Sequence, residues 1–235
     1  MAAATTDGRG IMMGQAAERA GSIDRASIDT VVFDLGGVLV DWNPRYAYRP
    51  LFDGDEEAME RFLAEICTSA WNHQLDEGRP FAEAIAELSA RHPDQAHLIR
   101  AWWDRWPDML GGVIPETVAL LEALHRDGVP LYAITNWSGE TFPIARGRFE
   151  FLKLFRDIVV SGDERLAKPD RRIFDLLVAR AGIDPRRSVF IDDAPKNVAA
   201  AEALGFAAVH FTGAEDLARR LRAYGFLGGL PGVAP

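Results

Sequence analysis

Short apolar segments that alternate with helical stretches constrain the fold of this chain more than any other feature. The segments at 30–33, 131–134, 158–160, 188–191 and 207–209 are rich in Val, Ile and Ala. Such runs are typical of buried strands, and those after residue 115 are separated by helical periodicity. Strands joined by helices form a parallel sheet. We therefore predict an α/β fold, with a Rossmann-like parallel sheet and helices on both faces.

Residues 43–109 differ from the rest of the chain because they have helical periodicity and no convincing strand. They follow the first predicted strand, where open α/β sheets place their ligand crevice. We predict an all-helical cap over 43–109, with Trp102, Trp103 and Trp106 in its core, and a Rossmann-like core formed by 29–42 and 110–235. Residues 1–28 are rich in small residues without periodicity and are predicted to be a disordered tail.

Charge and cysteine content limit the partners. The 26 basic and 35 acidic residues give a formal net charge of −9, which disfavours nucleic acid and anionic membrane surfaces as partners. The single cysteine, Cys67, excludes an internal disulfide and is interpreted as a buried thiol. No apolar run is long enough for a membrane span, and the N-terminus has no signal-peptide pattern. We expect a cytoplasmic monomer or homodimer.

Polar residues follow four of the predicted strands. Taken singly, each has an ordinary explanation as a helix cap, a turn former or a surface charge. Together they would meet at one edge of a parallel sheet, where clustered carboxylates repel one another unless a cation compensates them. A hard divalent ion such as Mg²⁺ is the economical solution. The residues are Asp34, Thr135, Asn136, Lys168, Asp192 and Asp193.

The order and spacing of these residues resemble the haloacid dehalogenase-like superfamily. The matching segments are 31–39, 134–136, 167–169 and 189–197, and the resemblance covers about 29–225. The Leu-Gly-Gly after Asp34 and the cap segment 71–78 look like the sugar phosphatases that act on glucose 1-phosphate. Within that segment Asn72 and His73 are candidate substrate contacts.

The resemblance implies a role for each strand-end residue. Asp34 would be the nucleophile that forms an aspartyl-phosphate, and Thr135 would hydrogen-bond the transferring group, with Asn136 beside it as a further catalytic residue. Lys168 would neutralise its charge. The metal ligands would be Asp34, the Gly36 carbonyl and Asp193, with Asp192 supporting Mg²⁺ directly or through water. The implied activity is hydrolysis of a small phosphate monoester, such as a hexose 1-phosphate.

One residue departs from the pattern of the family. Most phosphatases of the superfamily carry a second Asp two residues after the nucleophile as general acid and base, and here that position is Gly36. Asp41 is a candidate substitute, although a turn near Asn43-Pro44 also explains it. Without an acid beside Asp34, the sequence predicts a preference for acidic leaving groups.

Two other functions remain open. A metal-independent 2-haloacid dehalogenase would use Asp34 as nucleophile, and its relatives also lack the second acid. Asp192 and Asp193 argue against it, since extra negative charge does not help to bind a carboxylate substrate without a metal. A catalytically weak binding protein that keeps the fold is supported by Gly36 alone.

Overall fold

The computed structural model describes residues 28–228, so the predicted tail at 1–28 lies almost wholly outside the described residues. Its central element is a five-stranded sheet with the order β5-β4-β1-β6-β7. All four neighbouring pairs are parallel. The strands are β1 (Thr30–Phe33), β4 (Leu131–Thr135), β5 (Asp157–Val160), β6 (Ser188–Asp192) and β7 (Ala207–His210). The predicted α/β fold is confirmed.

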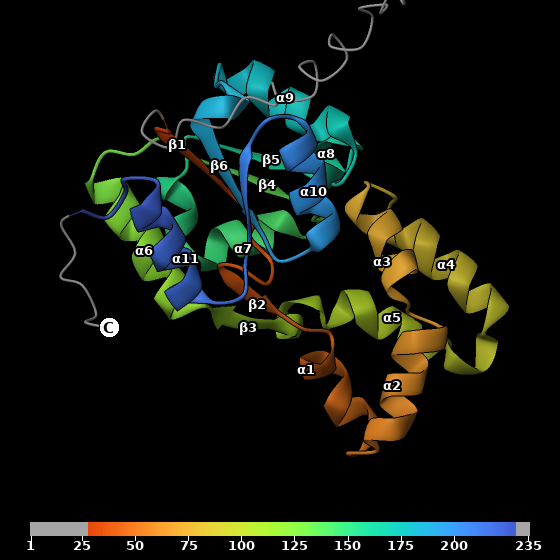
Figure 1. Ribbon diagram of the computed structural model, residues 1–235. Coiled ribbons are helices and arrows are strands. Elements are labelled where there is room, and N and C mark those ends of the chain that lie inside the picture. Colours follow the sequence, from red (N-terminus) through yellow and green to blue (C-terminus); the bar gives the residue numbers. More distant parts are fainter. Residues whose placement is uncertain (1–27, 229–235) are drawn as a thin grey trace, which may run out of the picture.

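Helices cover both faces of this sheet (Figure 1). On one face, Val31 and Phe33 pack in a cluster with side chains of α6 and α11, whereas Val32 faces the cluster formed by α9 and α10. Both faces are dry, which explains why the strands have near-continuous apolar sequences. The helices of the core are α6 (Pro115–Arg126), α7 (Phe142–Arg148), α8 (Ser161–Glu164), α9 (Arg171–Ala181), α10 (Pro195–Ala203) and α11 (Ala214–Ala223), with short 3₁₀ turns η5 (Glu150–Leu154) and η6 (Pro185–Arg187).

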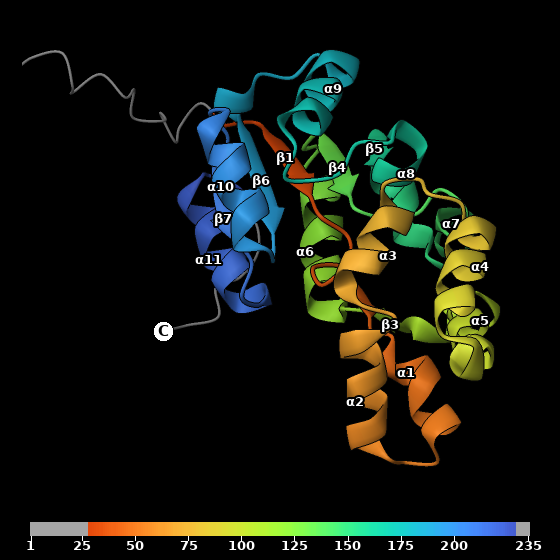
Figure 2. The ribbon, with the colours of Figure 1, turned by 90° about the vertical axis from the view of Figure 1, so that its right-hand side faces the viewer.

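A helical insertion follows the first strand, as the fold prediction requires, and in Figure 2 it lies beside and below the sheet domain. It contains α1 (Arg45–Tyr48), η2 (Arg49–Phe52), α2 (Glu56–Glu65), α3 (Ser69–Asp76), α4 (Phe81–Arg91), η3 (Pro93–Gln95), α5 (Ala96–Asp104) and η4 (Trp106–Met109). The domain bounds stay a prediction. We call this insertion the cap.

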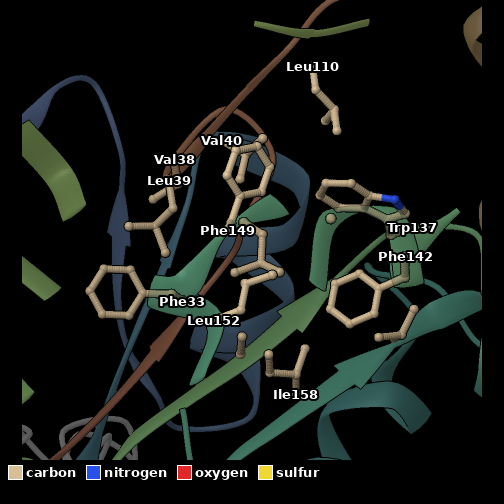
Figure 3. Close-up of a cluster of buried hydrophobic side chains, with 14 of the residues drawn as sticks. Phe33, Val38, Leu39, Val40, Leu110, Trp137, Phe142, Phe149, Leu152 and Ile158 are labelled. Carbon is tan, nitrogen blue, oxygen red and sulfur yellow. The ribbon is translucent and has the colours of Figure 1, made fainter. Parts of the chain in front are cut away.

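Two short strands connect the cap to the core. Strand β2 (Val40–Trp42) and strand β3 (Leu110–Val113) pair antiparallel, so the chain enters and leaves the cap through one ribbon. Figure 3 shows Leu110 of this ribbon near the indole of Trp137, which lies beside Phe142 with ring centroids 5.7 Å apart. The same buried cluster continues into the cap. Apolar packing around Leu110 and Trp137 therefore joins the cap to the core where the chain leaves the cap.

The cap core corrects one sequence prediction. Trp102 is buried among cap residues, but Trp103 is 41% exposed. Cys67 is a free, buried thiol, as predicted, and burial raises its pKa to about 12. Within residues 28–228, no helix combines the length and apolar character needed to cross a membrane.

Candidate active site

The strand ends gather the predicted residues at one edge of the sheet. Asp34 follows β1, which lies between β4 and β6, and these two strands end at Thr135 and Asp192. Beside them lies a cavity of about 260 Å³. Asp34, Asn136, Lys168 and Asp193 line this cavity. Thr135 is buried next to it and is not among the lining residues.

Lys168 is the electrostatic centre of this edge. Its ammonium lies 2.9 Å from Oδ1 of Asp34 and 2.6 Å from Oδ2 of Asp192, and its side chain is fully buried. Burial disfavours the charged form, but the two carboxylates outweigh this and raise the pKa of Lys168. The ammonium is therefore held charged between two strand ends.

Asn136 fixes the loop that carries Lys168. Its Nδ2 donates to the carbonyl of Lys168 at 2.9 Å, and its Oδ1 accepts from the backbone N–H of Lys168 at 2.8 Å. The two bonds use both ends of one amide. Asn136 thus positions the lysine backbone in this structure.

Asp192 is fully occupied by protein donors. Besides Lys168, it accepts from Nδ2 of Asn197, at 2.9 Å on Oδ1 and 3.1 Å on Oδ2, and from the backbone N–H of Ala194 at 2.9 Å. Its side chain is completely buried. Both oxygens of Asp192 are therefore used by protein donors, and Asp192 can support a metal ion only indirectly, by holding Lys168 and Asn197 in place. The sequence predicts no role for Asn197, which lies on α10. Its position five residues after Asp192 is the only sequence feature that could have indicated this contact.

Asp34 retains one free oxygen. Its Oδ1 accepts from Lys168 and from the backbone N–H of Leu35 at 2.7 Å. Oδ2 receives no hydrogen bond from the part of the chain that the structure describes. Burial raises the pKa of Asp34 to about 7; Lys168 opposes the rise and Asp192 adds to it. The free oxygen is the one available for attack or metal binding.

The carboxylate of Asp193 packs directly against the backbone of Gly37. Gly37 has a φ of +73°, and a Cβ built on it would lie 2.5 Å from Oδ2 of Asp193. A side chain at position 37 would displace the carboxylate. Burial, and next the charge of Asp192, raise the pKa of Asp193. Bare carboxylates are therefore unfavourable here without a cation.

The donor set fits a hard divalent cation. One carboxylate oxygen from each of Asp34, Asp192 and Asp193 lies within 4.8 Å of the others. Asp34 and Asp193 are the two with capacity to spare, and Mg²⁺ is typically held by one or two carboxylates together with waters and substrate phosphate. Asn197 lines the same cavity, and its buried Oδ1 has no hydrogen-bond partner within residues 28–228.

Gly36 and Asp41 lie in different surroundings. Gly36 lines the cavity, and a Cβ built on it would meet no atom within 4 Å. Asp41 does not line the cavity: it accepts from the Tyr46 hydroxyl at 2.7 Å and lies against Gly111, where it would clash with a Cβ. The structure thus gives no support for Asp41 as the substitute acid, because strand β2 carries it toward Tyr46.

The cap closes the other side of the cavity. Asn72, Asp76 and Trp106 of the cap line this side, together with Trp42 at the end of β2 and Trp137 after β4. Trp106 had been assigned to the cap core; it packs against Trp137 with ring centroids 5.7 Å apart and contributes to the cavity wall.

Of the two cap residues predicted to contact substrate, Asn72 lines the cavity and His73 does not. Nε2 of His73 lies 3.5 Å from Oε1 of Glu77 along the exposed side of α3. Asp76 had been assigned no role by sequence, although it lies one helical turn after Asn72.

Comparisons with known proteins find phosphatases among the relatives of this chain. A sesquiterpene phosphatase of Aspergillus oryzae is 27% identical over 187 residues, which cover 77% of this chain and 88% of that protein. A phosphoglycolate phosphatase of Rhodospirillum rubrum is 31% identical over 194 residues, covering 74% of this chain and 76% of its own. None of the relatives found supports glucose 1-phosphate specifically.

Solved structures share the fold. A haloacid dehalogenase family enzyme of Bacteroides thetaiotaomicron, crystallised as a magnesium complex, has a TM-score of 0.65 at 22% identity, with 83% of this chain and 99% of that chain covered. An L-2-haloacid dehalogenase of Xanthobacter autotrophicus has a TM-score of 0.58 at 18% identity, with 88% and 85% covered. The family model for haloacid dehalogenase-like hydrolases matches residues 28–205. The chain therefore belongs to the haloacid dehalogenase-like hydrolase family.

Proposed function

We propose that the protein is a Mg²⁺-dependent phosphatase that hydrolyses a small phosphate monoester through an aspartyl-phosphate on Asp34. The observation that carries this proposal is the charge balance of the site. Asp34, Asp192 and Asp193 face a single ammonium, that of Lys168, at a buried sheet edge. A phosphate dianion could not enter this environment without a further cation.

The residues divide the work of phosphoryl transfer. Oδ2 of Asp34 attacks phosphorus, Lys168 offsets negative charge on the transferring group, and Thr135 and Asn136 support that side of the cavity. Asp34, the Gly36 carbonyl and Asp193 would hold Mg²⁺, with Asp192 and Asn197 behind them. Bound there, the ion supplies positive charge to the phosphoryl oxygens. The phosphatases among the relatives support the phosphatase activity proposed here.

The cavity restricts the substrate class. About 260 Å³ accommodates a phosphate and a small organic group, and the indole walls favour a leaving group with an apolar face. Hexose 1-phosphates, aryl phosphates, short prenyl phosphates and phosphoglycolate are the compounds to compare. We place the protein in the cytoplasm, in keeping with its reduced thiol.

The test is an assay of the purified protein against these esters and against L-2-chloropropionate, each with Mg²⁺ and with EDTA. We expect phosphate release that requires Mg²⁺ and no chloride release. Chloride release that survives EDTA, without phosphate release, would overturn the phosphatase in favour of the dehalogenase. A protein that binds the esters without releasing either anion would be the weak binding protein.

A further inference from the structure

The proposed phosphatase lacks a proton donor beside its nucleophile, and the structure offers another source. Four ionisable residues line the cavity: Asp34, Asp76, Lys168 and Asp193. Asp34 attacks, Lys168 is paired with two carboxylates, and Asp193 belongs to the metal cluster. Only Asp76 remains without a function, and it comes from the cap wall.

Asp76 is held firmly at the end of helix α3. Nδ2 of Asn72, one turn earlier, donates to its Oδ2 at 2.9 Å, and its backbone carbonyl accepts from the Ser161 hydroxyl at 2.5 Å. Two residues later, a Cβ on Gly78 would lie 2.5 Å from the carbonyl oxygen of Gly162, so the helix end contacts the core backbone closely. The Asp76 carboxyl is thereby placed against the cavity in a defined position.

We infer that Asp76 is the general acid and base of the reaction, supplied by the cap in place of the residue missing at Gly36. This inference rests on the proposed phosphatase function. When Oδ2 of Asp34 bonds to phosphorus, the ester P–O bond breaks and its electron pair stays on the leaving oxygen, which takes the proton of Asp76. The products of this step are the free alcohol, the aspartyl-phosphate and the Asp76 carboxylate.

The second step restores the enzyme. The Asp76 carboxylate removes a proton from a water molecule as that water attacks phosphorus, and the bond between phosphorus and Asp34 breaks with its electrons returning to Asp34. Inorganic phosphate leaves, and Asp76 is protonated again. Atoms and charges balance over the two steps, and no other reactant is required.

The surroundings of Asp76 favour the protonated form that a donor needs. Burial raises the pKa of Asp76 well above its ordinary value; the Ser138 backbone N–H opposes the rise and the charge of Asp34 adds to it. A purely structural role is the competing explanation, since Asn72 and Ser161 also anchor the helix end. The experiment has to separate the two roles.

The test is the dependence of kcat/KM on leaving-group pKa, measured with aryl phosphates of graded phenol pKa and with an alkyl phosphate. We expect a shallow dependence in the wild type, in place of the preference for acidic leaving groups that Gly36 alone predicts. Asp76→Asn should lose about 10²-fold or more on the alkyl phosphate and less than about tenfold on the most acidic phenol, because general acid catalysis matters most for basic leaving groups. Glu77→Gln changes the neighbouring exposed carboxylate, at the C-cap of the same helix, and is the matched control that should behave as the wild type.

A rescue variant completes the design. Gly36→Asp in the Asp76→Asn background should flatten the dependence again, since a Cβ at Gly36 meets no neighbour within 4 Å. An equal loss on all esters in Asp76→Asn would show a structural role and overturn the inference. A steep wild-type dependence that Gly36→Asp alone flattens would also overturn it, even if Asp76→Asn failed to fold. Absence of phosphate release from every ester in the wild type would instead refute the proposed phosphatase itself.

Discussion

The two walls of the cavity are built on different principles. On the core wall, Asp34 and Lys168 are buried, and Lys168 forms charged hydrogen bonds to Asp34 and to Asp192, which lies behind the wall. On the cap wall, rings such as that of Trp106 provide shape, and the Asn72 to Asp76 bond lies within one helix. The core wall is a preorganised charge array, and the cap wall is an aromatic surface with one carboxyl group, that of Asp76. This difference teaches that the nucleophile and its charges depend on the core, whereas substrate shape and the proposed acid Asp76 depend on the cap.

The largest expected effect is on the core wall. Asp34→Asn keeps the shape of the nucleophile and removes its reactivity, so phosphate release should fall by about 10⁴-fold or more. The protein should remain folded, because the substitution removes a buried carboxylate whose pKa is already raised. Steady-state and single-turnover assays measure the loss.

Trp106→Phe is the counterpart on the cap wall. It keeps an aromatic ring at the cavity and should cost no more than about tenfold in kcat/KM. If it cost as much as Asp34→Asn, the division between the two walls would be mistaken.

The next effect concerns stability. Lys168→Met leaves two buried carboxylates without their shared cation and should lower the free energy of unfolding by about 3–5 kcal/mol at neutral pH. Lys153→Met is the matched control, because Lys153 pairs with Glu150 on the surface and its loss should cost less than about 1 kcal/mol. Denaturant titrations in EDTA compare the two variants, and equal losses would contradict the assigned importance of the core ion pairs.

The core wall was largely predictable from sequence, and the physical reason is the geometry of parallel sheets. Apolar runs locate the strands, and all strand ends emerge at one edge, so Asp34, Lys168 and Asp192 could be grouped without coordinates. Asn197 required the orientation of helix α10, which a local pattern does not contain. Its amide meets Asp192 only after that helix packs on the sheet.

Of the cap wall, the helical texture and Asn72 were predicted, whereas the place of Asp76 at the cavity was not. The ribbon that carries it includes Gly111 and Gly112, and strand β3 has little β-branched content to signal pairing. That ribbon moves Asp41 away from the cavity, whereas the contact of α3 with the core brings Asp76 to it. Such long-range placement depends on tertiary packing and left no periodic trace in the sequence.

The stabilisation of the protein by Mg²⁺ should depend on pH, because the ion binds the carboxylates of the core wall in their charged form. In metal-free protein the pKa of Asp34 rises from 3.8 to about 7, so the folded state binds the proton more tightly than the unfolded state. Stability should therefore fall as pH rises from about 4 to about 7. Mg²⁺ replaces that proton and should stabilise more strongly at pH 8 than at pH 5.5.

At pH 8, Mg²⁺ at 100 times its Kd should add about 2.7 kcal/mol, or roughly 5–10 °C in Tm. Thermal unfolding with Mg²⁺, with EDTA and with NaCl of matched ionic strength measures this gain. Asp34→Asn is expected to reduce both the gain and its pH dependence. The same gain at both pH values would show that the carboxylates are ionised throughout this range.

The smallest effect lies within the cap wall and compares neighbours on helix α3. Asn72 lines the cavity and donates to Asp76, whereas His73 lies outside it near Glu77. Asn72→Ala should lower kcat/KM by about tenfold, the worth of one hydrogen bond of about 1.4 kcal/mol, and should change the ranking of phosphate esters. His73→Ala should leave that ranking unchanged. A changed ranking with His73→Ala would mean that α3 rotates when substrate binds, and that the cap wall selects substrates through a conformation different from this one.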